Sequence, residues 1–107
     1  MTGLGECKMK ISPLVIGDTI AKIPIIQGGM GVGISLSGLA GAVAAEGGIG
    51  TISAAQIGFR DPEFSKNPIR TNLRVIGEEI RKARKIAPEG IIAINIMVAT
   101  KKYEEYV

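Results

Sequence analysis

The sequence predicts an α/β fold, in which short parallel strands alternate with helices. Apolar, β-branched segments at residues 23–27, 49–53 and 91–98 have the length and character of strands in a parallel sheet. The segments between them show the residue spacing of a helix, and glycine-rich turns separate the two kinds of segment. The predicted order is an N-terminal hairpin, then β, α, β, α, β and the start of another helix.

The stretch that links the first strand to the first helix is PIIQGGMGVGISLS, residues 24–37. Before it, residues 14–23 predict a small hairpin around the turn Gly17-Asp18. The glycines of the stretch permit close backbone approaches, and Ser35 or Ser37 is suited to cap the helix. Such a loop is either a tight βα turn or a surface that brings backbone N–H groups against a flat or anionic ligand. The spacing alone favours the two interpretations about equally.

Two helices are expected between the strands. The first covers residues 36–46, and its many small residues make it thin enough to lie close to a sheet. The second runs from residue 67 or 71 to residue 87, with Glu78 and Glu79 on a solvated face. The loop before it, residues 54–66, has the length of a functional lid and two aromatic anchors, Phe59 and Phe64. The second helix carries an apolar stripe formed by Ile69, Leu73, Ile76, Ile80 and Ala83.

The third strand, residues 91–98, is apolar almost throughout, as expected for a strand covered on both faces. Its alternation places Asn95 on the same face as Ile91 and Ala93. We therefore expect Asn95 to be a buried amide that needs hydrogen-bond partners, either from a ligand or from neighbouring backbone. Thr100 is expected to cap a last, short helix.

Composition restricts the class of protein. The chain has 107 residues, 46% of them hydrophobic and 21% charged, which suits one ordinary globular domain. The low aromatic content and a net charge of +3 on a solvated helix face argue against a nucleic-acid partner, and no apolar run reaches the ~18 residues of a membrane span. Cys7 is the only cysteine, so a reduced, cytoplasmic setting is the default expectation.

Several chemistries are excluded by the residues present. The chain has no histidine, and the glycine loop matches neither the dinucleotide fingerprint nor a phosphate loop with Gly-Lys-Ser/Thr. One cysteine cannot build a zinc site, and the carboxylates offer no convincing catalytic pair. We therefore assign no catalytic residue and no metal ligand.

The remaining polar and glycine residues gather at the carboxyl ends of the predicted strands, around residues 27–30, 53–55 and 95–97. Ligands bind at that edge both in doubly wound sheets and in (β/α)₈ barrels. The residues themselves leave both architectures open. A barrel typically needs ~250 residues, so in that case the chain would hold three strands of eight.

Three segments carry a resemblance to a known family: PIIQGGMGVGIS, AGAVAAEGGIGTISAAQIG and GIIAINIMVA. In order and spacing they resemble the N-terminal part of the nitronate monooxygenase family, also called 2-nitropropane dioxygenase-like proteins. This family includes the FMN-dependent enoyl-acyl carrier protein reductases. The resemblance extends from about residue 10 to residue 107, over the first third of the family's barrel.

The resemblance implies an FMN-dependent TIM barrel of which residues 1–107 form a single partial domain with about three βα units. It implies a flavoprotein oxidoreductase that oxidises nitronates or reduces enoyl thioesters, with a small-molecule substrate. The loop matching Gly28, Gly29 and Met30 would lie against the flavin, and the amide matching Asn95 would hydrogen-bond to it. The FMN phosphate loops would come from later strands, so we expect the isolated chain to be inactive and to self-associate through open sheet edges. The alternative is a non-enzymatic partial barrel that pairs with a separate chain.

Overall fold

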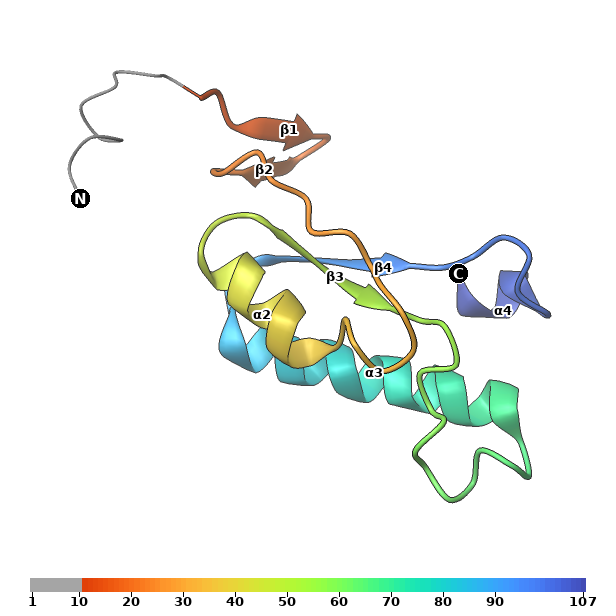
Figure 1. The fold of residues 1–107 in the computed structure, drawn as a ribbon. Coiled ribbons are helices and arrows are strands. Elements are labelled where there is room, and N and C mark those ends of the chain that lie inside the picture. Colours follow the sequence, from red (N-terminus) through yellow and green to blue (C-terminus); the bar gives the residue numbers. More distant parts are fainter. Residues whose placement is uncertain (1–10) are drawn as a thin grey trace.

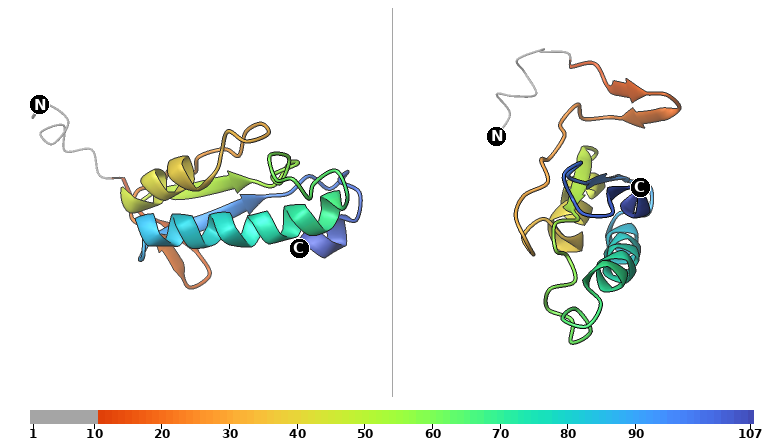
Figure 2. Two further views of the ribbon diagram at one scale, coloured as in Figure 1. Left: turned by 90° about the horizontal axis from the view of Figure 1, so that it is seen from below. Right: turned by 90° about the vertical axis from the view of Figure 1, so that its right-hand side faces the viewer.

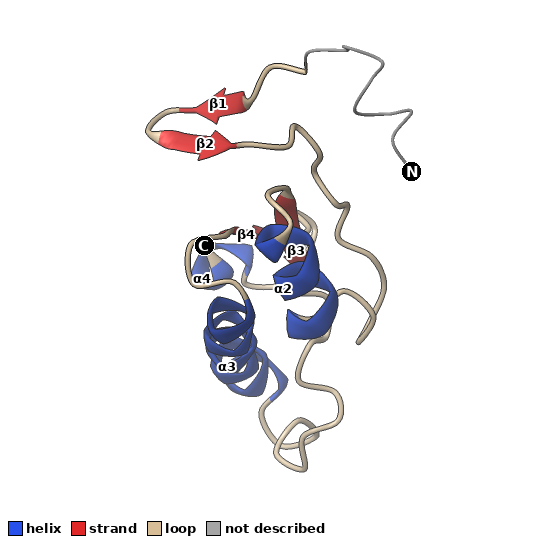
Figure 3. Ribbon diagram, turned by 90° about the vertical axis from the view of Figure 1, so that its left-hand side faces the viewer, coloured by secondary structure: helices blue, strands red, loops and turns tan. Residues whose placement is uncertain are grey.

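A computed structural model describes residues 11–107, so Cys7 lies outside the described part. The chain forms a body of two layers, strands over helices, and a separate hairpin (Figure 1). The hairpin lies on the other side of the strands from the helices (Figure 3). The elements are, in order, β1 Leu14–Ile16, β2 Thr19–Ala21, α2 Ser37–Ala45, β3 Ile49–Ser53, α3 Pro68–Ile86, β4 Ile91–Asn95 and α4 Tyr103–Tyr106.

The predicted hairpin is confirmed. Strands β1 and β2 are antiparallel, with Val15 opposite Ile20, and Gly17 takes a left-handed φ of 58° in the turn between them. Val15 and Ile20 are both largely exposed. Ala21, at the end of β2, is buried, so the hairpin is held mainly by its own ladder and by this one residue.

The first predicted strand, residues 23–27, is not a strand but an extended segment that makes one parallel bridge to β3, between Ile26 and Ile49. The Ile49 N–H donates to the Ile25 carbonyl at 2.8 Å, and the Gln27 N–H donates to the Ile49 carbonyl at 3.0 Å. Pro24 has no N–H to contribute. The prediction was wrong in type but right in position, since the segment lies beside β3.

Strands β3 and β4 are parallel and in register, with Ile52 opposite Ile94 and Ser53 opposite Asn95. Helices α2 and α3 pack side by side against the same face of this pair (Figure 2). The core between the layers consists of the buried residues Ala40, Ile52, Ile57 and Ala83, with Leu36, Val75, Ile76, Ile80, Ile92 and Ile94 around them. Within the described residues the α/β class is therefore confirmed, with helices on one face of the sheet.

Helix α2 lies very close to β3, as its small residues predicted. A Cβ on Gly50 would overlap the carbonyl oxygen of Ala40, so glycine is required at that point of contact. The predicted serine cap is wrong. The N-cap is Leu36, and no side chain of the cap residue bonds to the helix.

A carboxylate from α3 takes the place of that cap. Glu79 Oε1 accepts the Ser37 N–H at 2.9 Å, and Glu79 Oε2 accepts from Lys82 Nζ at 3.1 Å. Burial raises the pKa of Glu79, but the bonds from Ser37 and Lys82 outweigh burial and hold this pKa below its usual value. The prediction of a solvated Glu79 is wrong, because Glu79 is only 7% exposed and joins α3 to the start of α2.

Helix α3 begins and ends close to its predicted limits. Asn67 Oδ1 accepts the Arg70 N–H at 3.2 Å, and Pro68 occupies the first turn. The end of the chain differs more from the prediction. Strand β4 ends at Asn95 rather than residue 98, and the N-cap of α4 is Lys102, with φ 61°, rather than Thr100. Among residues 11–107, no helix combines the length and apolar character needed to cross a membrane.

Candidate functional site

Two of the predicted site residues, Gly29 and Asn95, lie on the face of the β3–β4 sheet that the helices leave open. Gly29 packs directly on that face: a Cβ on it would lie 2.6 Å from Asn95 Cβ and 3.3 Å from Thr51 Cγ2. Residues that are 66 positions apart in the sequence, Gly29 and Asn95, therefore meet at the carboxyl end of the sheet. The absence of a side chain at Gly29 lets the loop approach the sheet.

Gly28 differs from Gly29. A Cβ built on Gly28 would meet nothing within 4 Å, so its backbone faces open space. Met30 is 53% exposed beside it. Gly28 and Met30 thus present a surface of bare backbone and a flexible thioether, whereas Gly29 fixes the loop to the sheet.

Asn95 is exposed, and the expectation of a buried amide is wrong. The residues of β4 before it are only half-buried, because helices cover the strand on one face and the other face is open. Within residues 11–107 the Asn95 side chain makes no hydrogen bond, although its carbonyl accepts the Ala54 N–H at 3.1 Å. The amide is thus fixed in position by the strand and has free donors and an acceptor.

Gln27 belongs to the predicted cluster at the carboxyl ends of the strands, but its structural role was not predicted. Its Oε1 accepts the Thr51 N–H at 3.0 Å and its Nε2 donates to the Thr51 carbonyl at 3.1 Å, so the side-chain amide replaces a peptide group in the ladder with β3. Nε2 also lies 2.9 Å from the Gly28 carbonyl and 3.2 Å from Ser35 Oγ. Gln27 therefore fixes the first residue of the glycine loop against the sheet.

Two serines complete this network. Ser35 is fully buried, and its Oγ accepts the Met30 N–H at 2.9 Å. Ser53 Oγ donates to the Gly31 carbonyl at 2.9 Å, and the Ser53 N–H donates to the Ser35 carbonyl at 2.8 Å. The sequence signal was available: these are polar side chains at both ends of a glycine loop and at the end of an apolar strand.

Of the two predicted aromatic anchors of the loop at residues 54–66, Phe64 is half-buried, whereas Phe59 is 42% exposed. Asn72 of α3 also holds this loop. Asn72 Oδ1 accepts the Gly58 N–H at 2.7 Å, and Nδ2 donates to Gln56 Oε1 at 3.2 Å and to Tyr106 Oη at 3.0 Å. One buried amide thus joins this loop to both α3 and α4.

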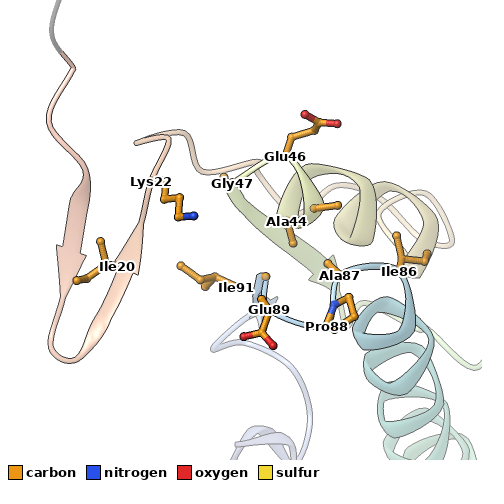
Figure 4. A pocket seen from close by; sticks show the side chains of 13 residues that line it. Ile20, Lys22, Ala44, Glu46, Gly47, Ile86, Ala87, Pro88, Glu89 and Ile91 are labelled. Atoms are coloured by element: carbon orange, nitrogen blue, oxygen red, sulfur yellow. The ribbon is translucent and has the colours of Figure 1, made fainter.

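Two cavities in the described part of the chain are not lined by the glycine loop. One cavity, of about 520 Å³, lies at the amino ends of β3 and β4 between the hairpin and the helix ends; Ile20, Lys22 and Ile91 are among its lining residues (Figure 4). The other, of about 470 Å³, lies at the carboxyl ends. Residues 11–107 contain no group of three His, Cys, Asp or Glu side chains that could hold a metal ion.

The fold and the open edge define a class: an α/β domain that presents a glycine loop and polar groups at the carboxyl ends of parallel strands, where ligands bind. The sequence pattern of the nitronate monooxygenase family matches residues 13–106. The chain therefore belongs to the nitronate monooxygenase family. A search of curated proteins found no match.

Proposed function

We propose that this chain supplies the flavin-ring side of an FMN-dependent oxidoreductase and forms the first three βα units of a TIM barrel. Family membership supports the oxidoreductase assignment. The barrel is supported by two features: helices α2 and α3 share one face, and residues 23–27, β3 and β4 lie side by side in sequence order. A doubly wound sheet would place helices on both faces.

The observation that carries the proposal is that the loop exposes backbone without a side chain at Gly28 and that β4 ends with the exposed side-chain amide of Asn95. Gly28 has open space where a side chain would be, and the Asn95 amide is exposed without a partner in the described chain. A flat ring system with polar edges fits this pair, because it stacks on backbone and accepts or donates hydrogen bonds at its rim. Met30 can pack against the ring as a polarizable side chain.

The roles of the chain's own groups follow from these positions. Gly29 holds the loop on the sheet and the Gly28 backbone faces the ring. Met30 borders the ring, and Asn95 orients it by hydrogen bonding. Flavin, when bound, supplies the acceptor and donor of electrons that oxidation of a nitronate or reduction of an enoyl thioester requires. The chain excludes water from one side of the ring, and we assign no acid, base or nucleophile among its described residues.

A second candidate function is an assembly module without catalytic activity. It is favoured by the exposure of apolar residues before and within the glycine loop: Ile25 is 59%, Ile26 is 58% and Ile34 is 61% exposed. Such a surface, next to strands with unpaired backbone groups, promotes self-association or pairing with the chain that carries the rest of a barrel.

Titration of the 107-residue chain with riboflavin and with FMN, followed by quenching of flavin fluorescence, tests the proposal. We expect weak binding of both compounds with similar affinity, since the ring is the part that this chain contacts. Asn95→Leu should weaken binding by about 1–3 kcal/mol, because polar ring edges lose their partner. The free energy of unfolding should not change, since the Asn95 side chain makes no bond within the described chain.

Three outcomes oppose the proposal. An unchanged flavin affinity in Asn95→Leu would remove Asn95 from the site. Absence of any binding, together with a concentration-dependent dimer in light scattering, would favour the assembly module. Stoichiometric retention of FMN by a compact monomer would instead indicate that the chain is a complete flavin-binding domain.

A further inference from the structure

The cavity of about 470 Å³ at the carboxyl ends of β3 and β4 is separate from the glycine loop. It lies between the loop after β3, the first turn of α3 and the segment after β4. Its walls include Ala54, Ala55, Ile69, Met97, Lys101 and Tyr106. The volume is within the range of small-molecule sites.

The walls of this cavity are held in place by Asn72, which is only 2% exposed. The bonds from Asn72 to Gly58, Gln56 and Tyr106 join three segments that border the cavity. Figure 2 shows α4, which carries Tyr106, beside the start of α3. Since Asn72 uses both its oxygen and its amide nitrogen in these bonds, it organises the cavity rather than serving as a free group inside it.

The chemistry of the lining is asymmetric. Ala54, Ala55, Ile69 and Met97 form an apolar wall, and Lys101 is the one charged residue among the residues that line the cavity in the described chain. No carboxylate lines it. The Tyr106 hydroxyl accepts a hydrogen bond from Asn72, which leaves its own proton to donate. Gln56, Asn67 and Thr100 also line the cavity, and the side-chain oxygens of Gln56 and Asn67 already accept hydrogen bonds. The polar side of the cavity therefore offers the Lys101 ammonium and the Tyr106 hydroxyl as donors and carries positive charge.

We propose that this cavity binds a short-chain aliphatic carboxylate. The alkyl chain lies against Ala55, Ile69 and Met97, and the carboxylate oxygens face the Lys101 ammonium and the Tyr106 hydroxyl. An anionic head matches a lining that has donors and no competing carboxylate, and an alkyl body matches the apolar wall. This proposal does not depend on flavin, since none of the residues assigned to the flavin lines the cavity.

The test uses the ¹⁵N-labelled 107-residue chain titrated with sodium hexanoate at constant ionic strength. Binding should shift the amide signals of Ala54, Ala55, Ile69 and Lys101, with a dissociation constant in the millimolar range expected for so small a ligand. 1-Hexanol has the same alkyl chain without the charge, and it should bind at least about threefold more weakly. Neither titration should move the signals of the glycine loop.

Variants tested in pairs show whether Lys101 attracts the carboxylate and whether the ligand occupies this cavity. Lys101→Gln should raise the dissociation constant for hexanoate about three- to tenfold. Lys102→Gln is the matched control, because Lys102 pairs with Glu105 and does not line the cavity, so it should leave the constant unchanged. Ala55→Phe, which fills the cavity from a half-buried position, should abolish the shifts while the rest of the spectrum stays folded.

The proposal is overturned if hexanoate produces no shifts around the cavity, or if hexanoate and 1-hexanol bind equally well. Equal effects of Lys101→Gln and Lys102→Gln would also overturn it, since the attraction would then be general rather than located at the cavity. If Ala55→Phe proves unfolded, Ile69→Ala replaces it and should weaken binding of hexanoate and 1-hexanol to the same degree.

Discussion

The two faces of the β3–β4 sheet are built on different principles. On the helix side, Ile52 and Ile94 pack into a closed apolar core with Ala40 and Ala83. On the other side, Thr51 and Asn95 alternate with them. There the glycine loop, which polar side chains hold in place, packs on Thr51 and on the Cβ of Asn95, while Asn95 stays exposed. Residues on the helix side thus stabilise the fold, whereas residues on the open side are free to contact a ligand. The helix side is fixed by packing, and the open side keeps exposed backbone and an unpaired amide.

The largest expected effect comes from the helix side. Ile52→Ala should lower the free energy of unfolding by about 2–5 kcal/mol, because a fully buried side chain is replaced by a cavity. Thr51→Ala is the matched change on the opposite face, one residue earlier, and should cost about 1 kcal/mol or less because its bonds to Gln27 use backbone atoms. Urea denaturation measures both values. Equal losses would mean that the two faces contribute alike.

A smaller effect separates the two adjacent glycines. Gly29→Ala should destabilise the chain by about 1–3 kcal/mol, since the new Cβ would lie too close to Asn95 Cβ. Gly28→Ala should leave the stability nearly unchanged but weaken riboflavin binding, because the Cβ enters open space where the ring is proposed to lie. Thermal unfolding and flavin titration are measured on both variants. A stable Gly29→Ala variant would contradict the close packing of the loop.

The junction between the helices gives the next effect. Glu79→Gln should lower stability at neutral pH by about 1–2 kcal/mol, because a buried carboxylate loses its charge-assisted bonds to Ser37 and Lys82. The folded pKa of Glu79 lies below its usual value, so its contribution is present above the unfolded pKa of about 4.3 and is lost as the pH falls through the folded pKa. Unfolding measured from pH 7 to pH 3 should therefore be less pH-dependent in the variant.

Glu78→Gln is the control for that experiment. Glu78 precedes Glu79 on α3 but is 38% exposed and pairs with Arg74, itself exposed. Its neutralisation should have a smaller effect than that of Glu79. If the free energy of unfolding depends on pH in the same way in both variants, the Glu79 contact with the start of α2 does not stabilise the fold.

Asn95 lies on the open face at the end of β4. Its replacement in Asn95→Leu should have the smallest effect on stability. We expect a change within about 0.5 kcal/mol, because no side-chain hydrogen bond within the described chain is lost and leucine keeps the Cβ that packs near Gly29. Urea denaturation of this variant and of Ile52→Ala compares the loss of unfolding free energy on the open face with the loss on the helix side. A large loss would show that the amide belongs to the fold.

The helix side could be predicted from the sequence, and the open side only in part. The apolar period of residues 68–86 determined α3, and the small residues of α2 indicated its close approach to β3. Periodicity reports which residues share a face, so it is informative wherever burial alone decides the structure.

The polar contacts could not be derived in this way. The bonds from Gln27 to Thr51 and from Glu79 to Ser37 join residues far apart in the chain, and no local pattern pairs them. Asn95 was placed on the correct face, but its exposure depends on what covers that face, which the strand's own sequence does not specify. The positions of the site residues were thus within reach of sequence reasoning, and their surroundings were not.

The central claim is that the open face of the sheet, and not the helix side, receives the flavin ring. Chemical-shift mapping of the ¹⁵N-labelled chain during a riboflavin titration tests it most directly. We expect the largest shifts at Gly28, Gly29, Met30 and the side-chain amide of Asn95, with Ala40 and Ala83 in the helix-side core unaffected. Shifts confined to α2 and α3, or spread evenly over the chain, would contradict the claim.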